Sequence, residues 1–128
     1  MRRCDRVTAG ARAQTTGTLS LVDVATGRAS RHYHGVVRDR FLVQPAFSFG
    51  ARAAHGESAV IAATRADGGA IACGGEDCAV RLWHVDGRGE PARVLVGHAA
   101  HVGAVAWHPA HPRVLATGSD DRTVRVWA

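Results

Sequence analysis

The sequence contains no lysine and no asparagine, so all 16 of its Lys and Arg residues are arginine. Together with 11 acidic residues they give a net charge of +5 at neutral pH. Nucleic-acid-binding proteins gather their basic residues on one face or stripe. Here the arginines are spread along the chain, as at Arg2, Arg28, Arg52, Arg81, Arg93, Arg113 and Arg125. Composition therefore argues against a nucleic-acid partner, and the missing AT-rich codons point to a GC-rich coding sequence as the source of the charge.

Cysteine and long apolar runs are also scarce. The three cysteines have no CxxC spacing, which argues against a disulfide framework and is typical of a reducing compartment. No apolar run approaches the ~20 residues that a membrane-spanning helix needs. We therefore expect no membrane association and a location in the cytoplasm, the nucleus or both.

The usual sequence signatures of catalysis are missing as well. The chain has no phosphate-binding loop, no paired catalytic carboxylates and no dinucleotide fingerprint. His98, Thr117 (or Ser119) and Asp121 have the residue types of a nucleophile–base–acid triad, but the G-x-S-x-G elbow that exposes a nucleophile is absent. We expect no catalytic residue and no cofactor.

A zinc site is a further hypothesis, because several histidines and cysteines lie in the second half of the chain. The candidates are Cys73, Cys78, His98, His101, His108 and His111. Their H-x2-H and C-x4-C spacings do not form a known set of ligand pairs. The sequence therefore predicts no metal site.

What the sequence does contain is a repeat. Residues 97–127 alternate apolar and polar side chains in short runs separated by turns, which predicts three antiparallel strands. The run Gly118-Ser119-Asp120-Asp121, followed by Val124-Arg125-Val126-Trp127, has a counterpart 44 residues earlier in Gly74-Gly75-Glu76-Asp77 and Val80-Arg81-Leu82-Trp83. A period of ~40–45 residues that opens on Gly-His and closes on Trp is typical of propeller blades, which are four-stranded sheets. A chain of 128 residues holds about three such blades.

These motifs resemble WD repeats over residues 18–128. The resemblance implies an all-β fold with antiparallel strands, namely a partial WD-repeat β-propeller of about two blades plus an edge fragment. It also implies a structural hydrogen-bond network formed by His98, Thr117, Asp121 and Trp127. The physical need for such a network is that buried indole, imidazole and carboxylate groups each require a partner.

The preceding repeat keeps only part of this network. Asp77 and Trp83 are present, but Cys73 stands at the Thr position and Val36 at the His position. We therefore predict that the middle blade is weaker and more mobile than the last one.

The repeats divide the chain into four segments. Residues 1–17 have no clear period and are left unassigned, and residues 18–35 are predicted to be the last two strands of an incomplete blade without partner strands. Residues 36–97 form the middle blade, with an insertion near 51–67 that we interpret as a surface loop or, alternatively, a partner-binding element. Residues 98–128 form a final blade that lacks its outer strand. The remaining blades would come from upstream sequence or from another chain.

A narrower resemblance concerns function. Residues 74–128 resemble the carboxy-terminal blades of the WD-repeat subunit of the GID/CTLH E3 ubiquitin-ligase complex, including His84 after Trp83 and the paired prolines Pro109 and Pro112. It implies a non-catalytic scaffold or substrate-receptor subunit that acts in proteasome-dependent protein degradation, with ubiquitin-ligase subunits or substrates as partners. The alternative is a generic WD-repeat adaptor in an unrelated assembly, such as trafficking, chromatin or signalling.

In WD-repeat propellers, the loops before the first strand and between the second and third strands lie on one face. By this resemblance we expect partner-facing residues at Glu76, Ala99, His101, Asp120 and Arg122.

Overall fold

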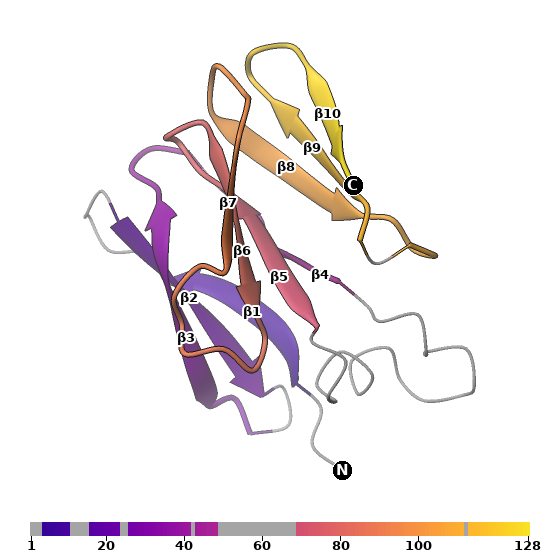
Figure 1. Cartoon of the computed structure of the whole chain (residues 1–128). Coiled ribbons are helices and arrows are strands. Elements are labelled where there is room, and N and C mark those ends of the chain that lie inside the picture. Colours follow the sequence, from indigo (N-terminus) through magenta and orange to yellow (C-terminus); the bar gives the residue numbers. More distant parts are fainter. Residues whose placement is uncertain (1–3, 11–15, 24–25, 42, 49–68, 112) are drawn as a thin grey trace.

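A computed structural model describes residues 4–10, 16–23, 26–41, 43–48, 69–111 and 113–128. In these residues the regular elements are all strands, and they form three antiparallel sheets that stand side by side (Figure 1). The prediction of an all-β fold with antiparallel strands is confirmed. We call the three sheets the first, middle and final blade.

The first blade consists of β1 (Cys4–Gly10), β2 (Thr16–Asp23) and β3 (Ala29–Val37), in that spatial order. The prediction that residues 18–35 have no partner strand is therefore wrong, because β1 pairs with β2 along its length. Residues 4–10 lie in the segment left unassigned. They show no clear alternation of apolar and polar side chains, and their strand conformation depends on a partner that local sequence does not reveal.

The middle blade consists of β4 (Ala46–Phe47), β5 (Ala70–Gly74), β6 (Ala79–His84) and β7 (Arg93–Val96), in that order. Its short first strand follows Pro45, which cannot donate a hydrogen bond to a ladder. The predicted insertion near 51–67 lies outside the described residues.

The final blade consists of β8 (Val102–Trp107), β9 (Leu115–Ser119) and β10 (Val124–Trp127). Strand β9 lies between the other two. Within the described part of the chain, β10 has β9 as its only strand partner, and its outward side chains Val124 and Val126 are exposed.

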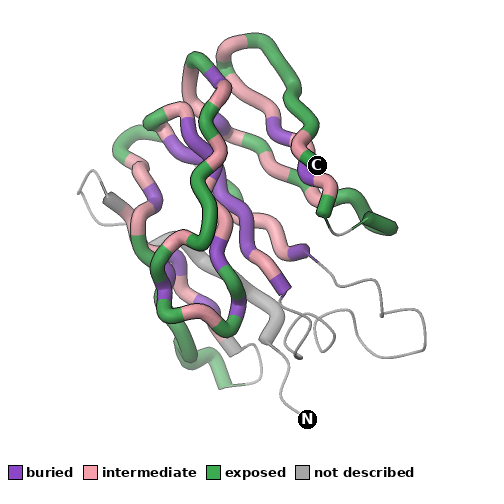
Figure 2. The backbone as a smooth tube through the Cα atoms, in the orientation of Figure 1, coloured by how far each residue is buried: buried purple, intermediate pink, exposed green. Residues whose placement is uncertain are grey.

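Two apolar layers hold the blades together, one on each face of the middle blade. Successive side chains of a strand point to opposite faces of a sheet, so Ile71 and Cys73 of β5 face the first blade while Ala72 faces the final blade. The first layer adds Leu19, Leu21, Tyr33, Val36 and Trp83, and the second adds Val80, Val102 and Leu115. Figure 2 shows this concentration of buried residues along the central strands.

The middle and final blades also meet backbone to backbone. A Cβ added to Gly74 would lie 2.0 Å from the carbonyl oxygen of Val102, and the Val102 amide donates a hydrogen bond to the Gly75 carbonyl at 3.1 Å. Such close approach requires a residue without a side chain. The glycine at position 74 is therefore part of the seam between the two blades.

Candidate functional site

The four side chains of the predicted network lie together in the final blade. The Trp127 Nε1–H donates to Thr117 Oγ1 at 2.9 Å, and that hydroxyl lies 2.7 Å from His98 Nε2. The other imidazole nitrogen, Nδ1, lies 2.9 Å from Asp121 Oδ2. The chain of bonds links the loop before β8, strand β9, the β9–β10 turn and strand β10.

The Asp121 carboxylate is the most heavily hydrogen-bonded group of the network. The Thr123 hydroxyl donates to Oδ1 at 2.5 Å, and the Ala99 amide donates to Oδ2 at 2.9 Å. These bonds, the Thr123 hydroxyl first, hold the pKa of Asp121 well below its usual range, against a smaller opposing effect of burial. An ionised Asp121 accepts the Nδ1–H of His98, which leaves Nε2 to accept the Thr117 hydroxyl proton.

The hydroxyl, imidazole and carboxylate are hydrogen-bonded in the same order as in a catalytic triad, but a substrate could not reach the hydroxyl. Thr117 is 1% exposed, and its oxygen already accepts the Trp127 indole N–H. A nucleophile must be exposed in a pocket beside an oxyanion hole, so the arrangement acts as a cross-link between segments rather than as a reaction centre.

The middle blade places its two retained residues with separate partners. The Trp83 Nε1–H donates to the His34 carbonyl at 3.0 Å, which ties the middle blade to the first. Asp77 forms a two-point ion pair with Arg81, at 3.0 and 2.5 Å. Sequence comparison with the final blade could not reveal either partner, because neither His34 nor Arg81 occupies a position of the final blade's network.

Apolar side chains occupy the two positions where the polar network is missing. Cys73 and Val36, at the Thr and His positions, are 1% and 2% exposed in the layer between the first and middle blades. Burial raises the pKa of the Cys73 thiol to about 12, so this thiol is neutral at physiological pH and packs as a small apolar group. The middle blade therefore needs no histidine or threonine to satisfy its tryptophan.

The five predicted partner-facing residues lie at one end of the sheets, in the loops that connect the strands. Ala99, Asp120 and Arg122 are exposed, and Arg122 has a positive φ of 67° in the β9–β10 turn. Ala99, Asp120 and Arg122 are therefore open to solvent and available for contact.

Glu76, by contrast, is engaged within the chain. Its Oε1 accepts three consecutive backbone N–H groups of the loop after β3, from Asp39, Arg40 and Phe41, at 2.9, 2.7 and 2.6 Å. The bond from Phe41 is the main reason that the pKa of Glu76 is lowered. Glu76 thus holds the loop between the first and middle blades.

His101 is engaged as well. Its ring stacks on Phe41 with centroids 4.9 Å apart, and its Nδ1 lies 3.4 Å from Asp120 Oδ2. Of the five predicted residues, Glu76 and His101 therefore have intramolecular contacts that also position the loops of this end.

The remaining zinc candidates are spread out. His108 Nδ1 accepts the backbone N–H groups of Ala110 and His111 at 3.0 and 3.1 Å, which closes the turn after β8. In the part of the chain that the structure describes, no three His, Cys, Asp or Glu residues gather as a metal site would require. The same described residues include no helix long and apolar enough to cross a membrane.

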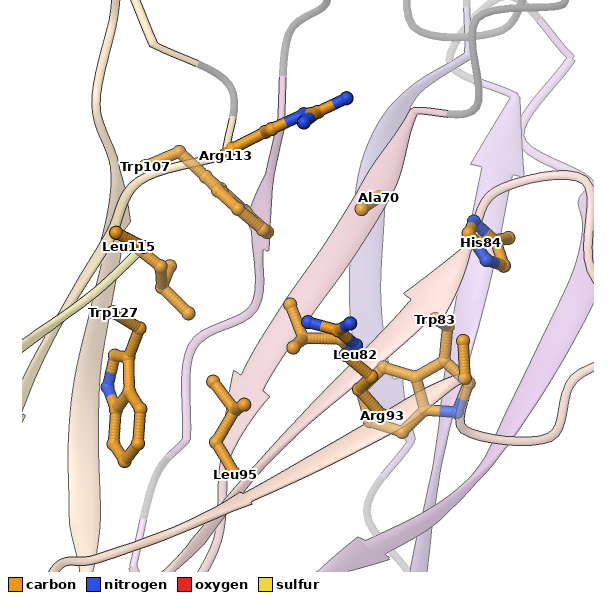
Figure 3. A pocket seen from close by; sticks show the side chains of 12 residues that line it. Ala70, Leu82, Trp83, His84, Arg93, Leu95, Trp107, Arg113, Leu115 and Trp127 are labelled. Carbon is orange, nitrogen blue, oxygen red and sulfur yellow. The ribbon is translucent and has the colours of Figure 1, made fainter.

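One surface feature has no counterpart in the sequence analysis. A groove of about 590 Å³ opens between the middle and final blades, and Leu82, Arg93, Leu95, Trp107, Arg113 and Trp127 are among its lining residues (Figure 3). The pattern of the strands predicts which side chains face inward, but not the space left where two blades diverge. The recurrence of Trp at the ends of strands was the only sequence feature that could have indicated this groove.

Stacked antiparallel blades, with a Trp–Thr–His–Asp network inside the final blade, define the class of protein as part of a β-propeller. Residues 89–128 match the family described as WD domain, G-beta repeat. With the relatives below, this match supports the WD40 repeat family, and the all-β structure fits a partial WD-repeat propeller.

Curated relatives match somewhat less than half of the chain. WD repeat-containing protein 26 homolog of Drosophila melanogaster is 47% identical over 57 residues, which are 44% of this chain and 9% of the relative. WD repeat-containing protein WDS homolog of Arabidopsis thaliana is 44% identical over 61 residues, 48% of this chain and 12% of the relative. Anaphase-promoting complex subunit cdc20 of Dictyostelium discoideum is 42% identical over 65 residues, 48% of this chain and 13% of the relative. The match thus spans about a tenth of the length of these relatives.

Proposed function

We propose that the chain is a non-catalytic scaffold for protein–protein interaction. The observation that carries the proposal is the burial of the final blade's network: the Thr117 hydroxyl, which already accepts the Trp127 indole N–H, is 1% exposed, and His98 is 6% exposed. The groups with the chemistry to react are thus used to fix the turns. WD40 domains are typically non-catalytic scaffolds, and the exposed loop end offers Asp120 and Arg122 for contact.

The more specific proposal is a scaffold or substrate-receptor subunit of a GID/CTLH-type ubiquitin ligase in the cytoplasm or nucleus. Its support is the resemblance of residues 74–128 to such subunits and the identity shared with a WD repeat-containing protein 26 homolog. A relative named as a subunit of the anaphase-promoting complex adds support for a role in a large assembly. The competing function, a generic adaptor, is favoured by the diversity of the relatives, which include Coronin-7 of Homo sapiens.

Affinity purification tests both levels. We suggest tagging the chain in cultured Drosophila cells and identifying recovered proteins by mass spectrometry, with the Asp120→Ala/Arg122→Ala double variant as the matched control. Recovery of RING and CTLH subunits, reduced in the double variant, is the expected result. Recovery of another assembly alone overturns the ligase proposal in favour of the adaptor. If the folded chain recovers nothing beyond an untagged control, the scaffold function itself is wrong.

A further inference from the structure

The groove between the middle and final blades has two walls from different sheets. Leu82, Arg93 and Leu95 of β6 and β7 form one wall, and Trp107 and Trp127, at the ends of β8 and β10, lie on the other. Figure 3 shows the indoles facing the leucines across the opening. A volume of about 590 Å³ lies in the range of small-ligand sites and accommodates one or two side chains of a peptide.

The indoles present only carbon to this groove. The Trp127 N–H is donated to Thr117 Oγ1, and the Trp107 N–H is donated to the Ala46 carbonyl at 3.1 Å. Because each N–H already has an acceptor, the tryptophans contribute apolar surface and no polar recognition. The part of the groove between the indoles and the leucines therefore favours binding of an apolar group.

The charged side chains that line the groove are of one sign. Arg93 and Arg113 line it, both are exposed, and neither has an ion-pair partner among the described residues. Other arginines of the described chain do have one: Arg31 pairs with Asp86 and Arg81 with Asp77. No aspartate or glutamate lines the groove. A guanidinium recognises a carboxylate through two parallel hydrogen bonds, so the rim complements an anion.

We propose that this groove binds an acidic peptide segment of a partner protein. An apolar side chain, aliphatic or aromatic, lies between the leucines and the indoles, and flanking Asp or Glu carboxylates pair with Arg93 and Arg113. The inference rests on the proposed scaffold function and specifies the chemistry of one partner. It also adds a contact at the side of the blades to the one proposed at the loop end with Asp120 and Arg122.

Fluorescence anisotropy with two synthetic peptides tests the proposal. Both are labelled hexapeptides with a central Leu-Phe; one has two glutamates on each side and the other two lysines. We expect the acidic peptide to bind and the basic one to bind at least ten times more weakly. The Arg93→Gln/Arg113→Gln double variant should weaken acidic-peptide binding at least tenfold, whereas Arg28→Gln, in the exposed turn between β2 and β3 of the first blade, should leave it unchanged. Circular dichroism verifies that both variants stay folded.

Ionic strength gives a second measurement that needs no variant. Because the ion pairs are at the exposed rim, affinity for the acidic peptide should fall as salt is raised. No binding of the acidic peptide, equal binding of the two peptides, or tighter binding of a labelled DNA duplex would overturn the proposal. If the peptide fails to bind while the tagged chain still recovers partner proteins from cells, only the groove assignment is wrong. If the chain recovers no partner, the scaffold function fails independently.

Discussion

The middle and final blades share a sequence pattern but stabilise their tryptophans in different ways. In the final blade, Trp127 donates to Thr117, which is bonded to His98 of the same blade. In the middle blade, Trp83 donates to the backbone of the first blade and is surrounded by apolar side chains. A blade covered on both faces can rely on burial, whereas a blade covered on one face in this structure relies on an internal polar network.

This difference changes the expectation for relative mobility. The incomplete network of the middle blade predicts a weaker and more mobile sheet. The packing argues for the reverse order, because Ile71, Val80 and Trp83 are at most 1% exposed while Val124 and Val126 are 74% and 68% exposed. Apolar burial contributes ~25 cal/mol per Å², so the middle blade has the larger stabilising term.

The largest expected effect comes from the two glycines at equivalent positions, Gly74 and Gly118. Gly74→Ala places a Cβ 2.0 Å from the Val102 carbonyl, whereas the nearest atom to a Cβ at Gly118 is the Ala104 Cβ at 3.6 Å. We expect Gly74→Ala to cost more than ~3 kcal/mol, or to prevent folding. Gly118→Ala should be close to neutral in the same thermal and urea unfolding experiments. Equal tolerance of the two substitutions would show that the blades do not meet at this seam.

The next largest effect is expected from substitutions that exchange polar and apolar groups at the equivalent positions Thr117 and Cys73. Thr117→Val keeps the volume but leaves the Trp127 N–H and His98 Nε2 without their shared partner, at a cost of about 2–3 kcal/mol in urea unfolding. The reciprocal change Cys73→Ser inserts a hydroxyl into an apolar layer and should cost about 1–3 kcal/mol. If Thr117→Val is neutral, the network contributes no stability and the comparison fails.

Acid should weaken the final blade through Asp121. Its pKa in the folded chain lies below the unfolded value, so the carboxylate stabilises the fold above pH ~4 and that contribution is lost as pH falls further. Glu76, whose pKa is also lowered, adds to the same acid sensitivity. Asp121→Asn should flatten the pH dependence of the unfolding midpoint below pH 5. A wild-type midpoint that is constant from pH 5 to pH 2.5 would contradict this account.

The smallest effect is expected at Asp77, the aspartate that corresponds to Asp121 in the middle blade. Its ion pair with Arg81 is partly exposed, with side-chain exposures of 31% and 16%, and such pairs contribute ~0–1 kcal/mol. Asp77→Asn should therefore lower stability by no more than about 1 kcal/mol in urea unfolding. A loss as large as that of Asp121→Asn would indicate a network in the middle blade that the hydrogen bonds of the structure do not show.

The sequence could predict features that depend on local pattern. The alternation of apolar and polar side chains and the repeated turn at Asp77 and Asp121 indicate the hairpins β5–β6 and β9–β10. The Gly-His motif that opens the last repeat and the Trp that closes it indicate which side chains meet in the final blade. These features depend on positions a few residues apart or on a family resemblance.

Features that depend on packing between distant segments could not be predicted. Strand β1 has no pattern of its own and is positioned by β2. The hydrogen bond from Trp83 to the His34 carbonyl joins residues of different blades. Glu76, predicted as a partner-facing residue, instead accepts backbone N–H groups of a loop and has a structural role. The groove arises from the divergence of two sheets and has no local signature.

Hydrogen exchange of backbone amides tests the central claim most directly, since it measures the opening of each strand separately. Amides of β5 and β6, covered by a blade on each face, should exchange more slowly than those of β9 and β10 at neutral pH. Slower exchange in β9 and β10 than in β5 and β6 would contradict the account, because it would show that the polar network of the final blade outweighs burial of the middle blade.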